Sequence, residues 1–376
     1  MRPLNIYLVS GSAAADVPGS TIMRDNFLRT LESAGHRVVA FNFVEDVTAA
    51  EIKEAGNLRE ARTRGMLKRF EHYHRQRPFD LAFCGVNNVT IRPDALRKIT
   101  DKVVTVNYTA NYHQVELVTD VARHVTLSTY ISLPAKEAFD RMGVRSFWMP
   151  MAANPDIYRP SAERLHYAAF VGTAYGQRPH LLWRLLQHGI DLHVYGPSWQ
   201  PRSRIGRLAR NWGEPLLYAI GDTESRLRFI NRNERRLIIE RMCAAYSARM
   251  HGPLSDAELV RILATSRIII NMAESRFNHD YLNPNVLRGC NFRDFEVPMA
   301  GSCLFTQYSS ELEHFYEPGK EVITYYDDVD LAEKLRFYAA DFPALQAIAD
   351  AGHRRATANH TWQNRFDALF AHIGLS

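Results

Sequence analysis

Short apolar runs rich in β-branched residues alternate with longer amphipathic segments over the first 150 residues. This alternation predicts βαβ units that build a parallel sheet. We expect helices at 21–34, in a long charged segment that ends near 75, and at 135–142. We expect strands at 6–9, 38–43, 81–84, 103–106, 125–128 and 146–149.

A proline-rich segment divides the chain. Residues 150–160 hold three prolines in eleven positions, which break helices and remove strand donors. We therefore place an N-terminal domain at 1–155 and a C-terminal domain at 161–356. The second half repeats the alternation, with expected strands at 167–171, 192–195, 267–271, 302–305 and 322–324, and helices at 178–187, 328–340, 343–356 and 362–372.

Length and composition agree with two α/β domains. The chain has 376 residues, of which 46% are hydrophobic, and this is too long for one ordinary core. The net charge of +5 argues only against acidic partners. Four scattered cysteines indicate neither a disulfide scaffold nor a zinc site. Because no apolar run approaches the roughly 20 residues of a membrane span, we expect a soluble, cytoplasmic protein.

An arginine-rich helical insertion is expected at about 200–250. Its arginines are interleaved with Leu, Ile and Phe, which is typical of solvated amphipathic helices. An alternative is a peripheral membrane or partner contact through 202–241. The insertion lacks a helix-turn-helix or an aromatic RNA-binding pattern, so we do not expect a nucleic-acid partner.

Residues 291–305 form the most informative segment. The pattern predicts a polar helix turn, a bend of small residues and a buried strand. Arg293 and Glu296 are three residues apart and share a helical face. A cation for phosphate and a carboxylate for two sugar hydroxyls would suit a nucleotide sugar. The alternative is a surface carboxylate followed by an ordinary helix end at Gly301.

Several motifs together resemble the GT-B glycosyltransferases and, within them, the CgeB-like branch related to spore proteins. They occur in the family's order between about 167 and 366: Phe170-Val-Gly-Thr173 followed by Arg178, Val194 to Trp199, Ile268 to Met272, Asn291 to Glu296 with Ala300-Gly301, Glu317 to Glu321, and Ala351 to Arg354 with His360 to Trp362. The resemblance implies two Rossmann-like, doubly wound lobes that face a cleft. It places the donor on the C-terminal lobe and the acceptor on the N-terminal lobe. It also implies that the helix at about 357–376 packs back on the N-terminal lobe.

The donor side can be assigned residue by residue. Gly172 and Thr173 end a strand and Arg178 opens the next helix, where backbone N–H groups can meet a diphosphate. The alternative is an ordinary turn with a solvated arginine. The resemblance implies ribose hydroxyls for Glu296. The other candidates on the donor side are Tyr195, Gly196, Asn271, Arg288, Arg293 and Gly301.

Arg288 departs from the pattern of retaining relatives, which often have a second glutamate eight positions before the ribose-binding one. Arg288 could contact phosphate or lie on the surface, and the stereochemical outcome stays open. The sequence Asp327-Asp-Val-Asp330 resembles a metal-binding Asp-x-Asp but starts a helix, where capping explains it. We therefore expect metal-independent chemistry with no cofactor.

The acceptor side offers only candidates for a general base. Asp16, His113 and Asp120 lie in or near loops that follow N-terminal strands. Relatives commonly have an acidic pair near His113, where this chain has Asn107 and Tyr108. Gly19 and Ser20, at the start of the first helix, could meet donor phosphate or acceptor.

The sequence thus favours a glycosyltransferase that uses a UDP-, GDP- or TDP-sugar and an unidentified acceptor. Two alternatives stay open: a nucleotide-sugar epimerase, and a non-catalytic protein of the same fold that binds nucleotide sugars or glycans.

Overall fold

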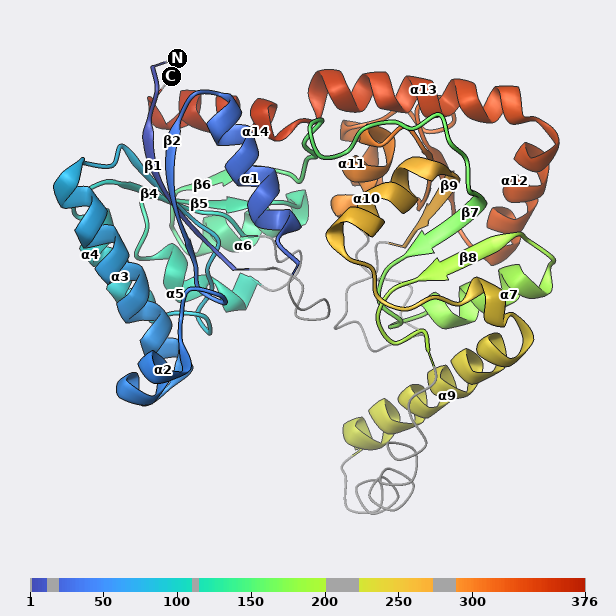
Figure 1. The fold of residues 1–376 in the computed structure, drawn as a ribbon, viewed down its shortest axis with the longest axis horizontal. Helices are drawn as coiled ribbons and strands as arrows, with labels where there is room; N and C mark the ends of the chain where they lie inside the picture. Colours follow the sequence, from blue (N-terminus) through green and yellow to red (C-terminus); the bar gives the residue numbers. More distant parts are fainter. Residues whose placement is uncertain (1, 12–19, 110–114, 201–222, 273–288, 376) are drawn as a thin grey trace. The chain divides into compact units, whose positions relative to one another are not determined.

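The computed structural model describes residues 2–11, 20–109, 115–200, 223–272 and 289–375 (Figure 1). The chain divides into two compact units. The first comprises Met1–Tyr158, Gly289–Glu296 and Arg355–Ser376, and the second comprises Arg159–Arg288 and Val297–Arg354. The main boundary falls inside the proline-rich segment. Gly289–Glu296, which we expected in the C-terminal domain, is grouped with the first unit.

The first unit is built on a six-stranded parallel sheet in the order β2-β1-β3-β4-β5-β6. Its strands are β1 (Asn5–Ser10), β2 (Arg37–Asn42), β3 (Leu81–Cys84), β4 (Val104–Asn107), β5 (Leu127–Tyr130) and β6 (Ser146–Trp148). Every residue of β1 and β3 is buried. Central strands of a parallel sheet are covered on both faces, which explains their nearly continuous apolar runs.

Helices cover this sheet, and the last helix of the chain is one of them. They are α1 (Ile22–Ser33), α2 (Ala49–Ala55), α3 (Leu58–Gln76), α4 (Arg97–Thr100), α5 (Thr119–Ala122), α6 (Lys136–Arg141) and α14 (Trp362–Ile373), with short 3₁₀ turns η1 (Pro93–Leu96), η2 (Val115–Leu117) and η3 (Leu133–Ala135). The terminal α14 packs on α1, where the rings of Phe27 and Trp362 meet edge to face at 4.6 Å.

The second unit contains a five-stranded parallel sheet in the order β11-β10-β9-β7-β8. Its strands are β7 (His166–Val171), β8 (Leu192–Tyr195), β9 (Ser266–Asn271), β10 (Cys303–Gln307) and β11 (Ile323–Tyr325). Its helical elements are α7 (Arg178–Gln187), α9 (Thr223–Ala245), η4 (Ser247–Arg249), α10 (Asp256–Thr265), η5 (Ser310–His314), α12 (Asp328–Ala340), the end of α11 (Phe292–Met299) and most of α13 (Phe342–Asn359).

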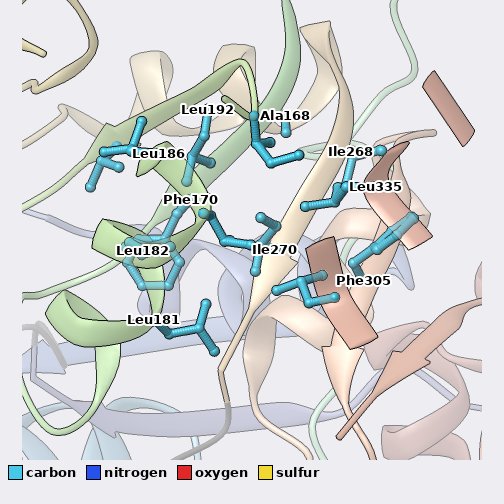
Figure 2. Close-up of a cluster of buried hydrophobic side chains, with 14 of the residues drawn as sticks. Ala168, Phe170, Leu181, Leu182, Leu186, Leu192, Ile268, Ile270, Phe305 and Leu335 are labelled. Carbon is cyan, nitrogen blue, oxygen red and sulfur yellow. The ribbon is translucent and has the colours of Figure 1, made fainter. Parts of the chain in front are cut away.

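One apolar core fills the space between this sheet and its helices. Figure 2 shows Leu181 and Leu182 of α7 beside Phe170 and Ile270 of the sheet, with Leu335 of α12 in the same cluster. The end of α9 joins this core through three buried side chains: Ile238, Ile239 and Met242. This part of the arginine-rich insertion is therefore a helix packed on the domain, whereas residues 201–222 lie outside the described residues.

The observed strands follow the predicted alternation, with small shifts at their ends. The predicted strand at 103–106 begins one residue later because the backbone N–H of Val103 still bonds to the carbonyl of Ile99. Helix α7 spans the predicted residues 178–187, with Pro179 in its first turn, and β8 spans 192–195 as predicted. Among the described helices, none is long and apolar enough to cross a membrane.

Candidate functional site

The strand order of the second sheet indicates where a ligand would bind. The order reverses between β7 and β9, because β8 lies on one side of β7 and β9 to β11 follow on the other. Ligands of open α/β sheets bind outside the carboxyl ends of the strands at such a switch point. Gly172 follows β7, Gly196 follows β8, and Asn271 ends β9. The structure thus brings three predicted donor residues to one sheet edge.

Gly172 and Gly196 pack backbone against backbone. A Cβ atom added at Gly196 would lie 2.3 Å from the Gly172 carbonyl oxygen, and Gly196 has a φ of 132°. The backbone N–H of Gly172 donates to the carbonyl of Tyr195 at 2.9 Å, and the indole N–H of Trp199 donates to the carbonyl of Gly172 at 2.6 Å. Only glycine fits at Gly196 without moving the β7 loop.

Arg178 links the two strands at the switch point. Its Nη1 donates to the carbonyl of Thr173 at 3.0 Å, and its Nη2 donates to the carbonyl of Met272 at 2.8 Å. The guanidinium carbon lies 3.9 Å from the centre of the Tyr175 ring, and the residue is only 7% exposed. The alternative of a solvated arginine is therefore wrong. Arg178 holds both loops and places a positive charge beneath them.

Asn271 is fixed at the end of β9 by two contacts. Its Nδ2 donates to the hydroxyl of Thr306 at 3.3 Å, and its backbone carbonyl accepts the hydroxyl of Tyr325 at 2.8 Å. Asn271 is buried, so these contacts set the shape of the strand end beside the Arg178 loop.

Tyr195 belongs to a cluster of three histidines in the second unit. Its hydroxyl is 2.7 Å from His166 Nε2, and its ring stacks on His251 at 4.2 Å. His193 Nδ1 lies 3.0 Å from His251 Nε2, and the His166 and His193 rings stack at 4.0 Å. Burial, together with the neighbouring imidazoles, lowers the pKa of His193 to about 4. The cluster holds the segment after η4 against β8.

Helix α11 presents the predicted Arg293 and Glu296 pair. Asn291 caps the helix, since its Oδ1 accepts the backbone N–H of Arg293 at 2.9 Å. Arg293 and Glu296 share a helical face, as the spacing predicted, and form an i,i+3 ion pair. Glu296 is 3% exposed, and its Oε1 also accepts the hydroxyl of Tyr158 at 2.5 Å. Both carboxylate oxygens are thus bound within the first unit.

Gly301 ends α11 in a left-handed conformation, with a φ of 77°. Its backbone N–H bonds to the carbonyl of Pro298 at 3.0 Å. A Cβ atom there would lie 2.8 Å from Cβ of Pro160. The structure thus gives Gly301 the features of a helix end packed against Pro160, the alternative that the sequence left open.

The first unit places two of its candidates in the core. The side-chain amide of Asn107 exchanges two hydrogen bonds with the backbone of Val86, each at 3.1 Å. Tyr108 is 3% exposed and packs edge to face on Trp362, and burial raises the pKa of its hydroxyl. Ser20 is buried just before α1.

Of the three general-base candidates, the described residues include only Asp120. Asp120 is exposed on α5 and pairs with Arg123 at 3.4 Å. Asp16, Gly19, His113 and Arg288 lie outside the described residues.

The Asp327 to Asp330 sequence caps a helix, as predicted. Asp327 Oδ1 accepts the backbone N–H groups of Val329 at 3.0 Å and Asp330 at 2.9 Å. Asp330 in turn pairs with Lys334 of the next turn at 2.8 Å. In the described parts of the chain, no three His, Cys, Asp or Glu side chains are arranged to hold a metal ion.

Sequence reasoning missed two residues at these sites. Trp199 is fully buried and binds the Gly172 carbonyl, and Tyr158 binds Glu296. Trp199 stands in the motif Val194 to Trp199 and could have been suspected. Tyr158 lies in the proline-rich segment, where no local pattern indicates a partner 138 positions away.

Known structures share this fold over nearly the whole chain. Sucrose-phosphate synthase from Thermosynechococcus elongatus matches with a TM-score of 0.59 and 14% identity, covering 98% of this chain and 99% of that one. Anabaena HepE in complex with UDP matches with a TM-score of 0.56 and 13% identity, at 98% and 99% coverage. A UDP-N-acetylglucosamine 2-epimerase matches with a TM-score of 0.52 and 11% identity, at 100% and 98% coverage. The two parallel-sheet α/β domains have the GT-B fold.

Sequence comparisons identify the family. Among curated proteins, none matches this chain. The model of the glycosyl transferase-like family matches residues 178–371, which is just over half of the chain. The matched region begins at Arg178 and includes β8 to β11 and the Arg293 and Glu296 pair. The chain belongs to the glycosyl transferase-like family.

Proposed function

We propose that this protein transfers a sugar from a nucleoside diphosphate sugar, with UDP as the first candidate nucleotide, to an unidentified acceptor hydroxyl. The observation that carries the proposal is the packing of Gly172, Gly196 and Arg178 at the switch point of the second sheet. Such an edge suits a diphosphate because ligands of open α/β sheets bind at the switch point and a cation lies beneath the two loops. The UDP complex of the structurally similar HepE supports the choice of nucleotide.

In the proposed reaction, the bond between the anomeric carbon and the β-phosphate oxygen breaks. A bond from the anomeric carbon to the acceptor oxygen forms, and the acceptor proton passes to a base that is not yet identified. Negative charge develops on the leaving diphosphate, and stabilising such charge is usually a large part of catalysis. Arg178, through the loop that it holds, and Arg293 are the cations proposed for this role.

Glu296 is the proposed ribose ligand. Each of its oxygens has one partner, Tyr158 or Arg293. A carboxylate accepts about four hydrogen bonds, so it can still accept two from ribose hydroxyls. We further propose metal-independent chemistry. In the Asp-x-Asp-like sequence, Asp327 caps helix α12 and Asp330 pairs with Lys334 of the same helix.

Titration calorimetry with UDP, GDP and TDP tests the donor, and incubation with the corresponding hexose conjugates tests turnover. We expect micromolar binding of one diphosphate and slow release of its sugar to water or to an added acceptor. The absence of binding by every nucleoside diphosphate would refute the proposal. Unchanged turnover after chelation by EDTA is expected if no metal takes part.

A nucleotide-sugar epimerase is the second candidate, and the fold shared with the 2-epimerase favours keeping it. The two differ in their products, because an epimerase converts its nucleotide sugar without an acceptor. Mass spectrometry and NMR of the products distinguish them. Membership of the CgeB-like branch and a partner contact through 202–241 also stay proposals, supported by the motifs and by the arginines of the insertion.

A further inference from the structure

Tyr158 makes a buried contact that the proposed reaction does not yet use. Its hydroxyl donates to Glu296 Oε1 at 2.5 Å, and the two residues are 1% and 3% exposed. The side-chain amide of Asn26, on α1, lies beside the same hydroxyl and donates through Nδ2 to the carbonyl of Ile22 at 2.8 Å. The contacts run from α1 through the proline-rich segment to α11, all within the first unit.

The protonation of Tyr158 gives this contact a fixed direction. Burial, and then the nearby Glu296 carboxylate, raise the pKa of Tyr158 well above its usual value. The hydroxyl therefore keeps its proton and donates to Glu296, since a carboxylate oxygen accepts. A phenylalanine would fill the same space, so packing alone does not require the hydroxyl. A buried hydroxyl is costly unless it is hydrogen-bonded, and this one is bound to the carboxylate.

The two partners of Glu296 fix the carboxylate at both ends. Tyr158 holds Oε1, and Arg293 holds Oε2. A carboxylate held in this way cannot rotate about its last torsion, and its unused lone pairs keep one direction. A neighbouring pair of sugar hydroxyls needs such a fixed acceptor, because both hydrogen bonds must form together.

We propose that Tyr158 is a positioning residue that orients Glu296 to accept both hydroxyls of the donor ribose. This inference rests on the proposed function, in which Glu296 binds ribose. It adds a determinant of specificity: recognition of the ribose diol depends on the proline-rich segment as well as on α11. The recognised chemical group is the cis-diol, and the nucleobase plays no part in it.

The test compares UDP with 2′,3′-dideoxy-UDP by titration calorimetry on four proteins. These are the wild type, Glu296→Gln, Tyr158→Phe and the control Tyr7→Phe. Tyr7 is also fully buried in the first unit and donates to the carbonyl of Met66 at 2.7 Å, so its variant loses a comparable hydrogen bond elsewhere. The measured quantity is the ratio of the two dissociation constants, which reports on the diol alone.

We expect UDP to bind more tightly than its dideoxy analogue to the wild type and to Tyr7→Phe, with equal ratios. Glu296→Gln should remove most of the preference, and Tyr158→Phe should reduce it about fivefold, the effect of one modest hydrogen bond. A wild-type ratio in Tyr158→Phe, with the preference lost in Glu296→Gln, would overturn the role of Tyr158 alone. A wild-type ratio in Glu296→Gln would refute the ribose contact itself.

Circular dichroism shows whether Tyr158→Phe folds. If it does not, Asn26→Ser provides the second variant, because it removes the amide beside the hydroxyl and leaves Tyr158 in place. A ratio reduced about twofold to threefold is then expected, and an unchanged ratio contradicts the inference.

Discussion

Replacing Gly196 with alanine tests the packing at the edge of the second sheet. The new Cβ atom would lie 2.3 Å from the carbonyl oxygen and 2.8 Å from the carbonyl carbon of Gly172. Both are backbone atoms, so no side-chain rotation relieves the overlap. The φ of 132° also disfavours any residue with a Cβ atom. The substitution must therefore displace the β7 loop.

Gly189→Ala is the matched control for the stability loss expected in Gly196→Ala. Gly189, just after α7, has a φ of 77°, and an added Cβ atom there meets nothing within 4 Å. Gly189→Ala should lose only the conformational preference of glycine, about 1–2 kcal/mol of the free energy of unfolding. Gly196→Ala should lose about 1–3 kcal/mol through φ and about 1–3 kcal/mol more through the displaced backbone.

Thermal unfolding and UDP calorimetry are the assays. A domain of roughly 150–250 residues loses about 2–4 °C in Tm per kcal/mol. We expect Gly196→Ala to melt about 2–12 °C below Gly189→Ala and to bind UDP at least tenfold more weakly, about 1.4 kcal/mol. Gly189→Ala should keep wild-type affinity. Equal melting temperatures and equal UDP affinities for the two variants would show that Gly196 does not need to be glycine for the Gly172 loop to keep its place.

Three further predictions concern the second unit. Arg178→Lys should lower the free energy of unfolding by about 2–4 kcal/mol, since an ammonium cannot reach both carbonyls, and a variant with wild-type denaturation would contradict the role of the guanidinium. The pKa of His193 is lowered to about 4 in the folded protein. Its contribution to the free energy of unfolding is therefore complete above the unfolded pKa of about 6.5, and this contribution is lost as the pH falls from about 6.5 toward 4. His193→Gln should therefore flatten the fall of Tm across this window, and an unchanged slope would exclude the cluster as its cause. Asp327→Ala should lose about 1 kcal/mol of stability as a cap and keep full activity, whereas loss of activity with intact stability would indicate a metal ligand.

Local patterns predicted the elements of this chain well, because the periodicity of apolar residues and the prolines are local signals. The i,i+3 spacing likewise predicted that Arg293 and Glu296 share one helical face, and their ion pair agrees with this. The glycine motif predicted the edge near Gly172. These inferences need only neighbouring residues.

The partners of these residues could not be predicted, because they come from distant parts of the chain. Arg178 binds a carbonyl 94 positions away, and Glu296 binds a tyrosine 138 positions away. The sequence therefore left Arg178 open between a ligand contact and a solvated charge. Only the pairing of β7 with β9 shows that it is buried. Gly196 is similar, since its need for glycine depends on the opposing backbone of Gly172.

A crystal structure with bound UDP would show directly where the donor nucleotide binds. We predict the diphosphate at the carboxyl edge of the second sheet, within hydrogen-bonding distance of the loop that follows β7 at Gly172 and Thr173. We also predict ribose hydroxyls on the Glu296 carboxylate. UDP bound elsewhere, with the Gly172 loop and Glu296 both out of its reach, would contradict the proposed donor site.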